Sequence, residues 1–284
     1  MRTCYTRPCN FFYGNYAKKL IKNKKAFSLA GREDIAFDQI EIFQRKKIKK
    51  KGSTIYTIKE INKIDKKILP TIKKDLKNII SRRKSILGLK FNTPLLVGIL
   101  NITPDSFSDG GLFFEGSKAY EQAKLMINAG SSIIDIGGES TRPGSVTIDE
   151  KDEWQRVKNT ITNLKEKFPK TILSLDTRKS YVMEKGIKHG INIINDVSGL
   201  NFDNKSFNVI NSKKIPFILH HMQGTPSTMQ KNPKYNDVLL DIYDFFEREI
   251  LNMSDNKKII LDPGIGFGKT LKHNLTLISK ISLF

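Results

Sequence analysis

A parallel α/β barrel is the fold class that the sequence predicts for residues 91–284, and three observations point to it. Short runs of Val, Ile and Leu recur along this part of the chain, and a helix-like stretch follows each run. Continuous apolar runs that alternate with helices indicate parallel strands buried on both faces. Six such units within about 190 residues match the spacing of a (β/α)8 barrel. Polar residues also stand at the end of nearly every run.

The six predicted strands follow one another in the order expected of repeated βα units. They are Leu95–Leu100, Ile133–Ile136, Ile172–Leu175, Ile193–Ile194, Pro216–Leu219 and Ile259–Leu261. A doubly wound sheet is the structural alternative, but no G-x-G-x-x-G string follows the first run. The sequence ends at Phe284, after the helix expected to follow the sixth strand. We therefore expect a barrel truncated after about six βα units.

The first part of the chain has a different character, because it holds most of the excess positive charge. Residues 1–90 contain 25 Lys and Arg against 7 Asp and Glu, a net charge of +18, whereas the remainder is near +2. We expect a basic N-terminal extension or small accessory domain at 1–90, and the barrel at 91–284. Residues 1–51 look irregular apart from a short strand at Asp38–Phe43. Residues 54–87 suggest one or two short helices, with a break or restart at Pro70.

Composition excludes several classes of protein. No apolar run is long enough to span a bilayer, and the first residues lack the features of a secretory signal. Cys4 and Cys9 have no second pair with which to complete a zinc site. The basic end permits binding to RNA, but it shows no aromatic stacking motif, so nucleic acid is not favoured as a partner. We expect a cytoplasmic protein with no membrane contact.

Polar groups close the predicted strands one after another. They are Asn101, Asp135 to Glu139, Asp176, Asn195-Asp196, His220-His221 and Asp262. An isolated Asp or Asn at such a place often caps the next helix. In a barrel, however, all these strand ends converge on one rim, which is where active sites of this fold lie. A shared polar site explains six consecutive strand ends better than capping does.

Two longer strings predict what this site binds. Residues 101–111 combine two glycines with small hydroxyl and carboxylate side chains, which suits a loop that closes over a substrate. Residues 137–144 combine hydroxyls, glycine amides and Arg142, which suits a cradle for a phosphate group.

These two strings occur in order with Asp176-Thr-Arg, Asn195-Asp-Val-Ser-Gly, His221-Met-Gln-Gly and the segment from Leu261 to Lys269. In this respect the sequence resembles the dihydropteroate synthase family of pterin-binding barrels, from about Leu96 to Ser279. The resemblance implies a transferase of folate biosynthesis, in which 4-aminobenzoate displaces diphosphate from 6-hydroxymethyl-7,8-dihydropterin diphosphate. It also implies Mg²⁺ as a cofactor and a homodimer.

The resemblance further implies a role for individual residues. Asp176, Asn195 and Asp262 would hydrogen-bond the pterin ring, since a carboxylate and an amide can together complement its donor and acceptor edge. Met222 and Phe267, together with His221, would form an apolar wall, and Lys269 would lie near the same pocket.

The remaining roles concern the leaving group. Thr141 and Arg142 would bind the diphosphate, and Asn101 would bind Mg²⁺ or the diphosphate. Asp105 and Phe107 would belong to the closing loop, with Asp105 and Arg142 as the catalytic residues. The implied mechanism is dissociative, with the C–O bond to diphosphate breaking first, so no nucleophile–base pair is expected.

Two other functions remain open on the sequence. A methyltetrahydrofolate-binding methyltransferase barrel shares the Asp, Asn and Asp set, but residues 101–111 and 137–145 are the strings that serve diphosphate departure. A non-catalytic pterin-binding or RNA-binding protein is the other alternative. It is suggested by the basic end and by the family's last two strands, whose basic segments the sequence does not contain. We accordingly expect weak or no activity from residues 1–284 alone.

Overall fold

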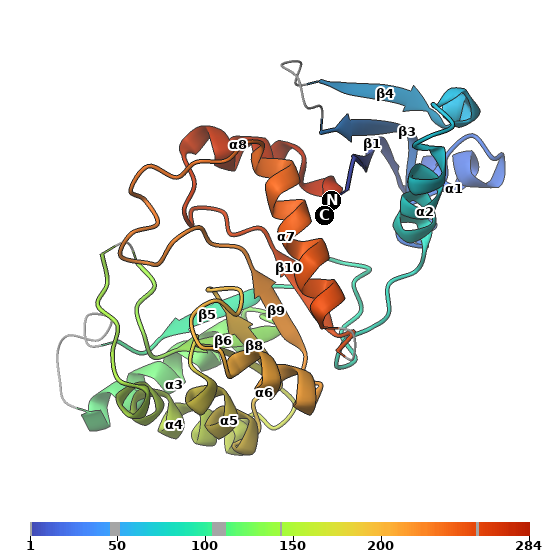
Figure 1. Cartoon of the computed structure of the whole chain (residues 1–284). Helices are drawn as coiled ribbons and strands as arrows, with labels where there is room; N and C mark the ends of the chain where they lie inside the picture. Colours follow the sequence, from blue (N-terminus) through green and yellow to red (C-terminus); the bar gives the residue numbers. More distant parts are fainter. Residues whose placement is uncertain (1, 46–51, 104–111, 143, 254–255) are drawn as a thin grey trace. The chain divides into compact units, whose positions relative to one another are not determined.

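The computed structural model describes residues 2–45, 52–103, 112–142, 144–253 and 256–284, with only the backbone of residues 112–117 (Figure 1). The chain divides into two compact units. The smaller unit contains residues 1–92 together with Asp237–Asp244 and Thr276–Phe284. The larger unit contains Thr93–Asn236 and Phe245–Leu275. The predicted domain division at residue 90 stays a prediction. The smaller unit also contains Asp237–Asp244 and Thr276–Phe284, which lie far along the chain.

The larger unit is built on one parallel sheet, as the sequence predicts. Its strands are β5 (Val97–Asn101), β6 (Ile133–Gly137), β7 (Ile172–Asp176), β8 (Ile193–Asp196), β9 (Phe217–His220) and β10 (Ile259–Asp262). Each strand pairs in parallel with the next along the chain, in the order β10-β9-β8-β7-β6-β5. All six predicted strands are confirmed, and each overlaps the apolar run that predicted it. Closure into a barrel stays a prediction.

Helices connect these strands, and α3 to α6 lie along one side of the sheet (Figure 1). They are α3 (Leu112–Asn128), α4 (Glu150–Lys167), α5 (Ser180–Lys188), α6 (Ser206–Lys213), α7 (Val238–Asn252) and α8 (Leu271–Ser279). The start of α4 is well specified, because the side chain of Asp149 accepts a hydrogen bond from the Lys151 amide at 2.8 Å. Acidic residues in its first turn and lysines in its last turn complement the helix dipole.

The core of this unit explains why the strands are apolar without alternation. All five residues of β6 are buried, and Leu173 and Leu175 of β7 are completely inaccessible. A strand covered on both faces needs apolar side chains at odd and even positions alike. At β5 the pattern changes, since Leu100 is buried while Val97 and Ile99 are exposed.

The smaller unit contains an antiparallel sheet that the sequence analysis largely missed. Its elements are β1 (Cys4–Tyr13), α1 (Gly14–Lys22), β2 (Phe27–Ser28), β3 (Ile35–Gln44), β4 (Ser53–Thr57), the 3₁₀ helix η1 (Ile58–Lys63) and α2 (Leu69–Ile80). The predicted strand at Asp38–Phe43 is confirmed as part of β3, and Pro70 stands in the first turn of α2, as predicted. The prediction that residues 1–51 are otherwise irregular was wrong, and residues 53–57 are strand rather than helix.

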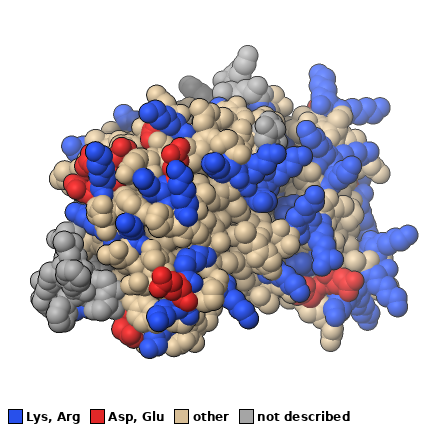
Figure 2. Space-filling model, turned by 90° about the horizontal axis from the view of Figure 1, so that it is seen from below, with Lys and Arg blue, Asp and Glu red and all other residues tan. Residues whose placement is uncertain are grey.

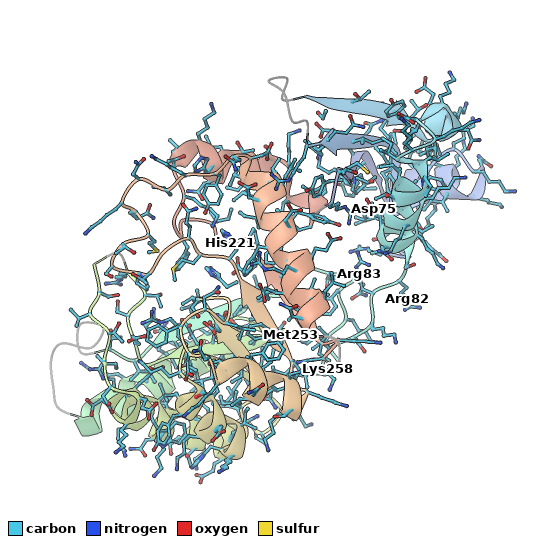
Figure 3. All side chains as sticks on the ribbon, viewed as in Figure 1. Asp75, Arg82, Arg83, His221, Met253 and Lys258 are labelled. Atoms are coloured by element: carbon cyan, nitrogen blue, oxygen red, sulfur yellow. The ribbon has the colours of Figure 1, made fainter. Side chains whose placement is uncertain are left out.

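The error at β1 has a physical cause. Thr6 and Arg7 interrupt the apolar pattern of the strand, yet both are bonded to residues far along the chain. The Thr6 hydroxyl donates to Asp75 at 2.8 Å, and Arg7 Nε donates to Glu41 on β3 at 2.8 Å. Asp75 lies on α2, where Figure 3 labels it. Polar side chains that tertiary partners satisfy can be buried in a strand, and sequence periodicity does not reveal this.

The antiparallel sheet also contacts Asp237–Asp244 and Thr276–Phe284, the two later segments of the smaller unit. The Tyr5 hydroxyl donates to Asp244 at 2.7 Å, and Arg45 Nη2 donates to both Asp241 and Asp244 at 2.8 Å. Lys280 Nζ reaches both carboxylate oxygens of the buried Glu41, at 2.8 and 2.9 Å. The acidic side chains at this face thus have cationic partners.

The remaining lysines of the small unit mostly point to solvent. On α1, for example, Lys18, Lys19 and Lys22 are all exposed. Figure 2 shows Lys and Arg spread over the face it displays, with few Asp and Glu between them. No helix among the described residues is long and apolar enough to cross a membrane.

Candidate active site

The strand ends of the larger unit bring several of the predicted polar residues side by side. We call the four positions 101, 137, 176 and 195 the strand-end row, or the row. Asn101 on β5 pairs with Gly137 on β6, Gly137 with Asp176 on β7, and Asp176 with Asn195 on β8. Parallel strands in this register place four consecutive positions side by side at the carboxyl edge of the sheet. Three of the ten predicted site residues therefore lie next to one another because of the sheet alone.

Glycine at position 137 leaves a space between two of these side chains. A Cβ atom there would stand 3.3 Å from Asn101 Oδ1 and 3.5 Å from Asp176 Oδ2. The backbone of β6 thus forms the floor between the amide of Asn101 and the carboxylate of Asp176. Glycine in a strand often marks a place where a ligand approaches the backbone closely.

Asp135 orients the Asn195 amide within this row. Asn195 Nδ2 donates to Asp135 Oδ2 at 2.9 Å, which leaves Asn195 Oδ1 as the free end of the amide. Among the described residues, Asn195 Oδ1, Asp176 Oδ1 and Asp135 Oδ1 are buried with no hydrogen-bond partner. The Ser174 hydroxyl of β7 lies beside the Asp135 carboxylate and lowers its pKa, so the Asp135 oxygen has a polar neighbour in the protein. Buried polar atoms in native proteins are almost always bonded, so the unpartnered oxygens of Asp176 and Asn195, on adjacent strands, indicate a ligand that donates hydrogen bonds.

Burial and like charge act together on these carboxyl groups. Burial is the main reason that the pKa of Asp176 lies well above its usual value, and the negative charges of Asp135, Glu153 and Asp196 raise it further. Burial likewise raises the pKa of Asp135, and the charge of Asp262 adds to it. A ligand that donates hydrogen bonds would stabilise these groups in their ionised form.

Asp262 comes from the far edge of the sheet. It ends β10, where it pairs in register with His220 of β9, and its Oδ1 accepts a hydrogen bond from the Gly264 amide at 2.8 Å. His220 Nδ1 lies 2.9 Å from the Val197 carbonyl, and its ring meets Phe267 edge to face at 4.7 Å. These contacts tie His220 to the segment after β8 and to the loop after β10.

Lys269 is bonded to backbone groups of the protein. Its side chain is buried, and Nζ donates to the carbonyls of Phe267 at 2.8 Å and His221 at 3.1 Å. Burial lowers the pKa of Lys269 to about 7. Burial also lowers the pKa of His221 to about 3, with a further contribution from the Lys269 charge. The described bonds of Lys269 join the loops after β9 and β10, and its predicted contact with substrate stays a prediction.

The predicted diphosphate residues lie on a surface loop. Arg142 is exposed and Thr141 is half-buried, and the loop meets the segment after β9 where the Gly144 amide donates to the Pro226 carbonyl at 3.2 Å. Met222 and Phe267 are both half-buried. Asp105 and Phe107 lie outside the described residues.

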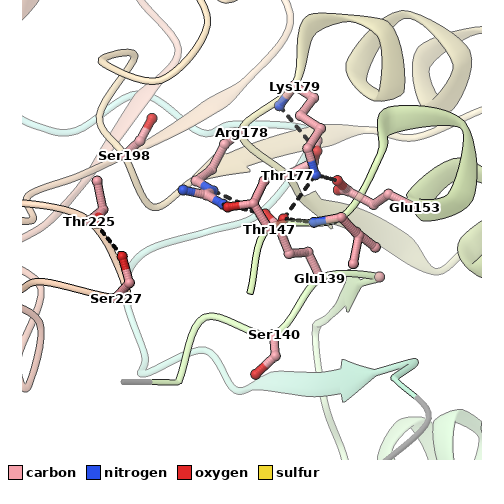
Figure 4. Close-up of polar contacts among 12 residues, drawn as sticks. Glu139, Ser140, Thr147, Glu153, Thr177, Arg178, Lys179, Ser198, Thr225 and Ser227 are labelled. Atoms are coloured by element: carbon pink, nitrogen blue, oxygen red, sulfur yellow. Dashed lines mark hydrogen bonds and ion pairs between the residues drawn. The ribbon is translucent and has the colours of Figure 1, made fainter. Parts of the chain in front are cut away.

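The sequence analysis assigned no role to a group of four buried charged residues next to the row. They are Glu139, Glu153, Arg178 and Lys179, and all are at most 5% exposed (Figure 4). One feature of the sequence could have pointed to this group. Glu139 and Arg178 each stand two residues after the end of a strand, β6 and β7 respectively. Asp135 was likewise noted at a strand end but given no role, although it lies two residues before Gly137 and so faces the same side of β6.

The larger unit is thus a parallel sheet with unpartnered carboxylate and amide oxygens at its carboxyl edge. Residues 97–284 match the family model described as "Pterin binding enzyme". The chain is 41% identical to the dihydropteroate synthase of Escherichia coli over 201 residues, which are 69% of this chain and 71% of that protein. It is also 41% identical to the Bacillus subtilis enzyme, over 74% of this chain and 72% of that protein. The chain belongs to the dihydropteroate synthase family.

Solved structures support the same assignment. The Yersinia pestis dihydropteroate synthase, crystallised with a sulfonamide drug, superimposes with a TM-score of 0.64 at 39% identity, over 70% of this chain and 74% of that one. The Xanthomonas albilineans enzyme in complex with 7,8-dihydropteroate has a TM-score of 0.59 at 30% identity, over 68% and 69% of the two chains.

Proposed function

We propose that this chain is a transferase that joins 6-hydroxymethyl-7,8-dihydropterin diphosphate to 4-aminobenzoate, releasing diphosphate and forming the 7,8-dihydropteroate of folate synthesis. The observation that carries the proposal is the pair of buried, unpartnered oxygens on Asp176 and Asn195. The pterin ring offers the N–H donors that such acceptors need. The relatives named above carry the name of this enzyme, which favours it over the methyltransferase and the non-catalytic alternatives.

Pterin recognition would rest on the strand-end row. Asp176 and Asn195 would accept hydrogen bonds from the 2-amino group and ring N–H, and Asp262 would bind the ring from the β10 edge. Because Asp135 holds Asn195 Nδ2 at 2.9 Å, the amide presents its oxygen rather than its nitrogen. The half-buried Met222 and Phe267 would pack on the apolar faces of the substrates.

The diphosphate would bind beside the row. Thr141 and Arg142 would contact it, since a hydroxyl and a guanidinium are suitable donors to phosphate oxygens. Among the described residues, no group of three or more His, Cys, Asp or Glu side chains could hold a metal. Asn101 alone still fits Mg²⁺, because this ion keeps several waters and binds through few protein oxygens and the phosphates of a substrate. Bound there, Mg²⁺ would neutralise charge on the leaving diphosphate.

In the reaction that we propose, the C–O bond to diphosphate breaks and its electron pair leaves with the diphosphate. The amine of 4-aminobenzoate then forms the C–N bond and loses a proton. This chain would contribute mainly orientation and charge stabilisation. Asp105 in the closing loop and the homodimer stay predictions, as does the cytoplasmic location.

We further propose that the six strands are six of the eight in a (β/α)8 barrel. The support is that all are parallel and neighbours in chain order, and that edge strand β5 exposes Val97 and Ile99.

Calorimetry with Mg²⁺ and the pterin diphosphate tests the proposed function, followed by addition of 4-aminobenzoate and an assay of released diphosphate. We expect the chain to bind the pterin diphosphate and Asp176→Asn to abolish that binding. Asp152→Asn is the matched control, because it makes the same change at an exposed position of α4. Failure of the unaltered chain to bind the pterin diphosphate, or equal binding by Asp176→Asn, would contradict the proposal.

A further inference from the structure

The four buried charged residues beside the row form one continuous network. Arg178 donates to Glu139 Oε2 from Nε at 3.1 Å and from Nη2 at 2.6 Å. Lys179 Nζ donates to Glu139 Oε1 at 3.0 Å and also binds the Glu153 carboxylate. Figure 4 shows both cations turned toward Glu139. The network contains two acidic and two basic side chains, whose formal charges balance.

Glu139 also closes the loop between β6 and α4, which we name the β6–α4 loop (residues 138–149). It stands near the start of that loop, and its Oε1 accepts a hydrogen bond from the amide of Ile148, near the end, at 3.0 Å. Thr147, one residue earlier, accepts a further bond from Arg178 Nη2 at 3.4 Å. A single buried carboxylate therefore holds both ends of the loop together, with Thr141 and Arg142 between them.

The network ties this loop to three neighbouring elements. Lys179 connects Glu139 to Glu153 in the first turn of α4, and Lys179 itself directly precedes α5. The Arg178 guanidinium lies 4.1 Å from the centre of the Phe202 ring, in the segment after β8. Burial alone would raise the pKa of Glu139, but the bonds from Arg178, Ile148 and Lys179 outweigh it and lower the pKa. Glu139 is consequently a fixed, ionised anchor.

We propose that Glu139, held by Arg178 and Lys179, is the positioning residue that sets the β6–α4 loop for the diphosphate of the substrate. The inference rests on the proposed function, because Thr141 and Arg142 are the diphosphate-binding residues there. Glu139 acts through the loop and does not contact the pterin. Its loss should therefore weaken the binding of a pterin that carries diphosphate and spare the binding of the pterin alone.

The test compares two probes by calorimetry on the full chain with Mg²⁺: 6-hydroxymethyl-7,8-dihydropterin diphosphate, and 6-hydroxymethyl-7,8-dihydropterin without the diphosphate. For Glu139→Gln we expect the affinity for the first probe to fall about tenfold or more, because small misplacement of a binding group is costly. The affinity for the second should stay within about twofold, since the described hydrogen bonds of Glu139 go to Arg178, Lys179 and Ile148 and none goes to a pterin residue. Glu166→Gln is the control, as it makes the same change at an exposed position of α4.

Arg178→Lys provides a second variant if Glu139→Gln does not fold. It keeps the charge but loses the paired donation to Glu139 and the bond to Thr147, so we expect a smaller loss for the same probe. Equal losses for both probes in both variants would show a general effect on the fold and overturn the proposal. Unchanged binding of both probes would overturn it too. If the unaltered chain binds neither probe, the proposed function itself is wrong, and the inference falls with it.

Discussion

Gly137→Ala tests whether the space between Asn101 and Asp176 receives the ligand. The added methyl would stand 3.3 Å from Asn101 Oδ1 and 3.5 Å from Asp176 Oδ2, which is a tight but tolerable contact. Alanine in a strand interior gains about 0.5–1 kcal/mol over glycine through the unfolded chain, and this offsets the crowding. We expect the free energy of unfolding to change by less than about 1 kcal/mol. The melting temperature should accordingly move by no more than about 2–4 °C.

Ligand binding should respond much more strongly than stability. The methyl fills the floor of the row, so the pterin diphosphate should bind at least tenfold more weakly, a loss of about 1.4 kcal/mol or more. Calorimetry measures this affinity, and thermal unfolding followed by circular dichroism measures the stability. Gly52→Ala is the control, because a Cβ there meets nothing within 4 Å and the residue has no positive φ. A folded Gly137→Ala variant with an unchanged dissociation constant would refute the placement of the ligand.

Three further predictions concern stability. Burial raises the pKa of Asp196 to about 6, so the folded state binds this proton more tightly than the unfolded state does. The free energy of unfolding should therefore fall by about 3 kcal/mol as the pH rises from about 4 to about 6. Urea titrations at several pH values measure this change. Burial lowers the pKa of Lys269 to about 7, so its effect on the pH dependence of stability has the opposite sign. The free energy of unfolding should rise between about pH 7 and 10, and Lys269→Met should flatten that slope. Gly186→Ala should cost about 1–3 kcal/mol, because its methyl would overlap Leu175 Cδ2 in the core, as a shift in the urea midpoint would show.

Each of these has a clear contrary result. A flat stability profile below pH 6 would show that Asp196 is not the buried acid described here. The same slope in Lys269→Met and the unaltered chain would assign the alkaline effect to another group. A midpoint for Gly186→Ala equal to that of Gly52→Ala would show that the packing at Leu175 is looser than the structure indicates.

The sequence was sufficient for the sheet of the larger unit, because parallel strands buried on both faces consist of uninterrupted apolar residues. It was also sufficient for the row, since the strand ends were visible and the register of parallel neighbours brings Asn101, Asp176 and Asn195 together. The antiparallel sheet at the start of the chain was missed for the converse reason. Its first strand buries Thr6 against Asp75 and half-buries Arg7 against Glu41, and only the folded chain supplies those partners.

The loop anchor was beyond sequence reasoning for a related reason. Glu139 is separated from Arg178 by 39 residues and from Lys179 by 40, so their contact depends on the pairing of β6 with β7. Charged residues near strand ends can be read from the sequence. Which of them meet one another, and which remain free to meet a ligand, cannot be decided without the register and the side-chain geometry.

Glu139 and Asp176 are both buried carboxyl groups of the larger unit, but only Glu139 has its charge balanced by neighbouring cations. This difference distinguishes a residue that positions a loop from a residue that binds a ligand. The Glu139 carboxylate has four described donors and a lowered pKa, so it is complete without a ligand. Asp176 has an unpartnered oxygen and a raised pKa, and like charges surround it. An isolated buried charge is costly, and it is retained where a bound molecule supplies the missing donors. Asp176→Asn should therefore leave the stability of the free chain equal or higher while it abolishes pterin binding, whereas Glu139→Gln should lower stability. Measurements of stability and of pterin binding thus distinguish Asp176, which binds the substrate directly, from Glu139, which only holds the loop beside it.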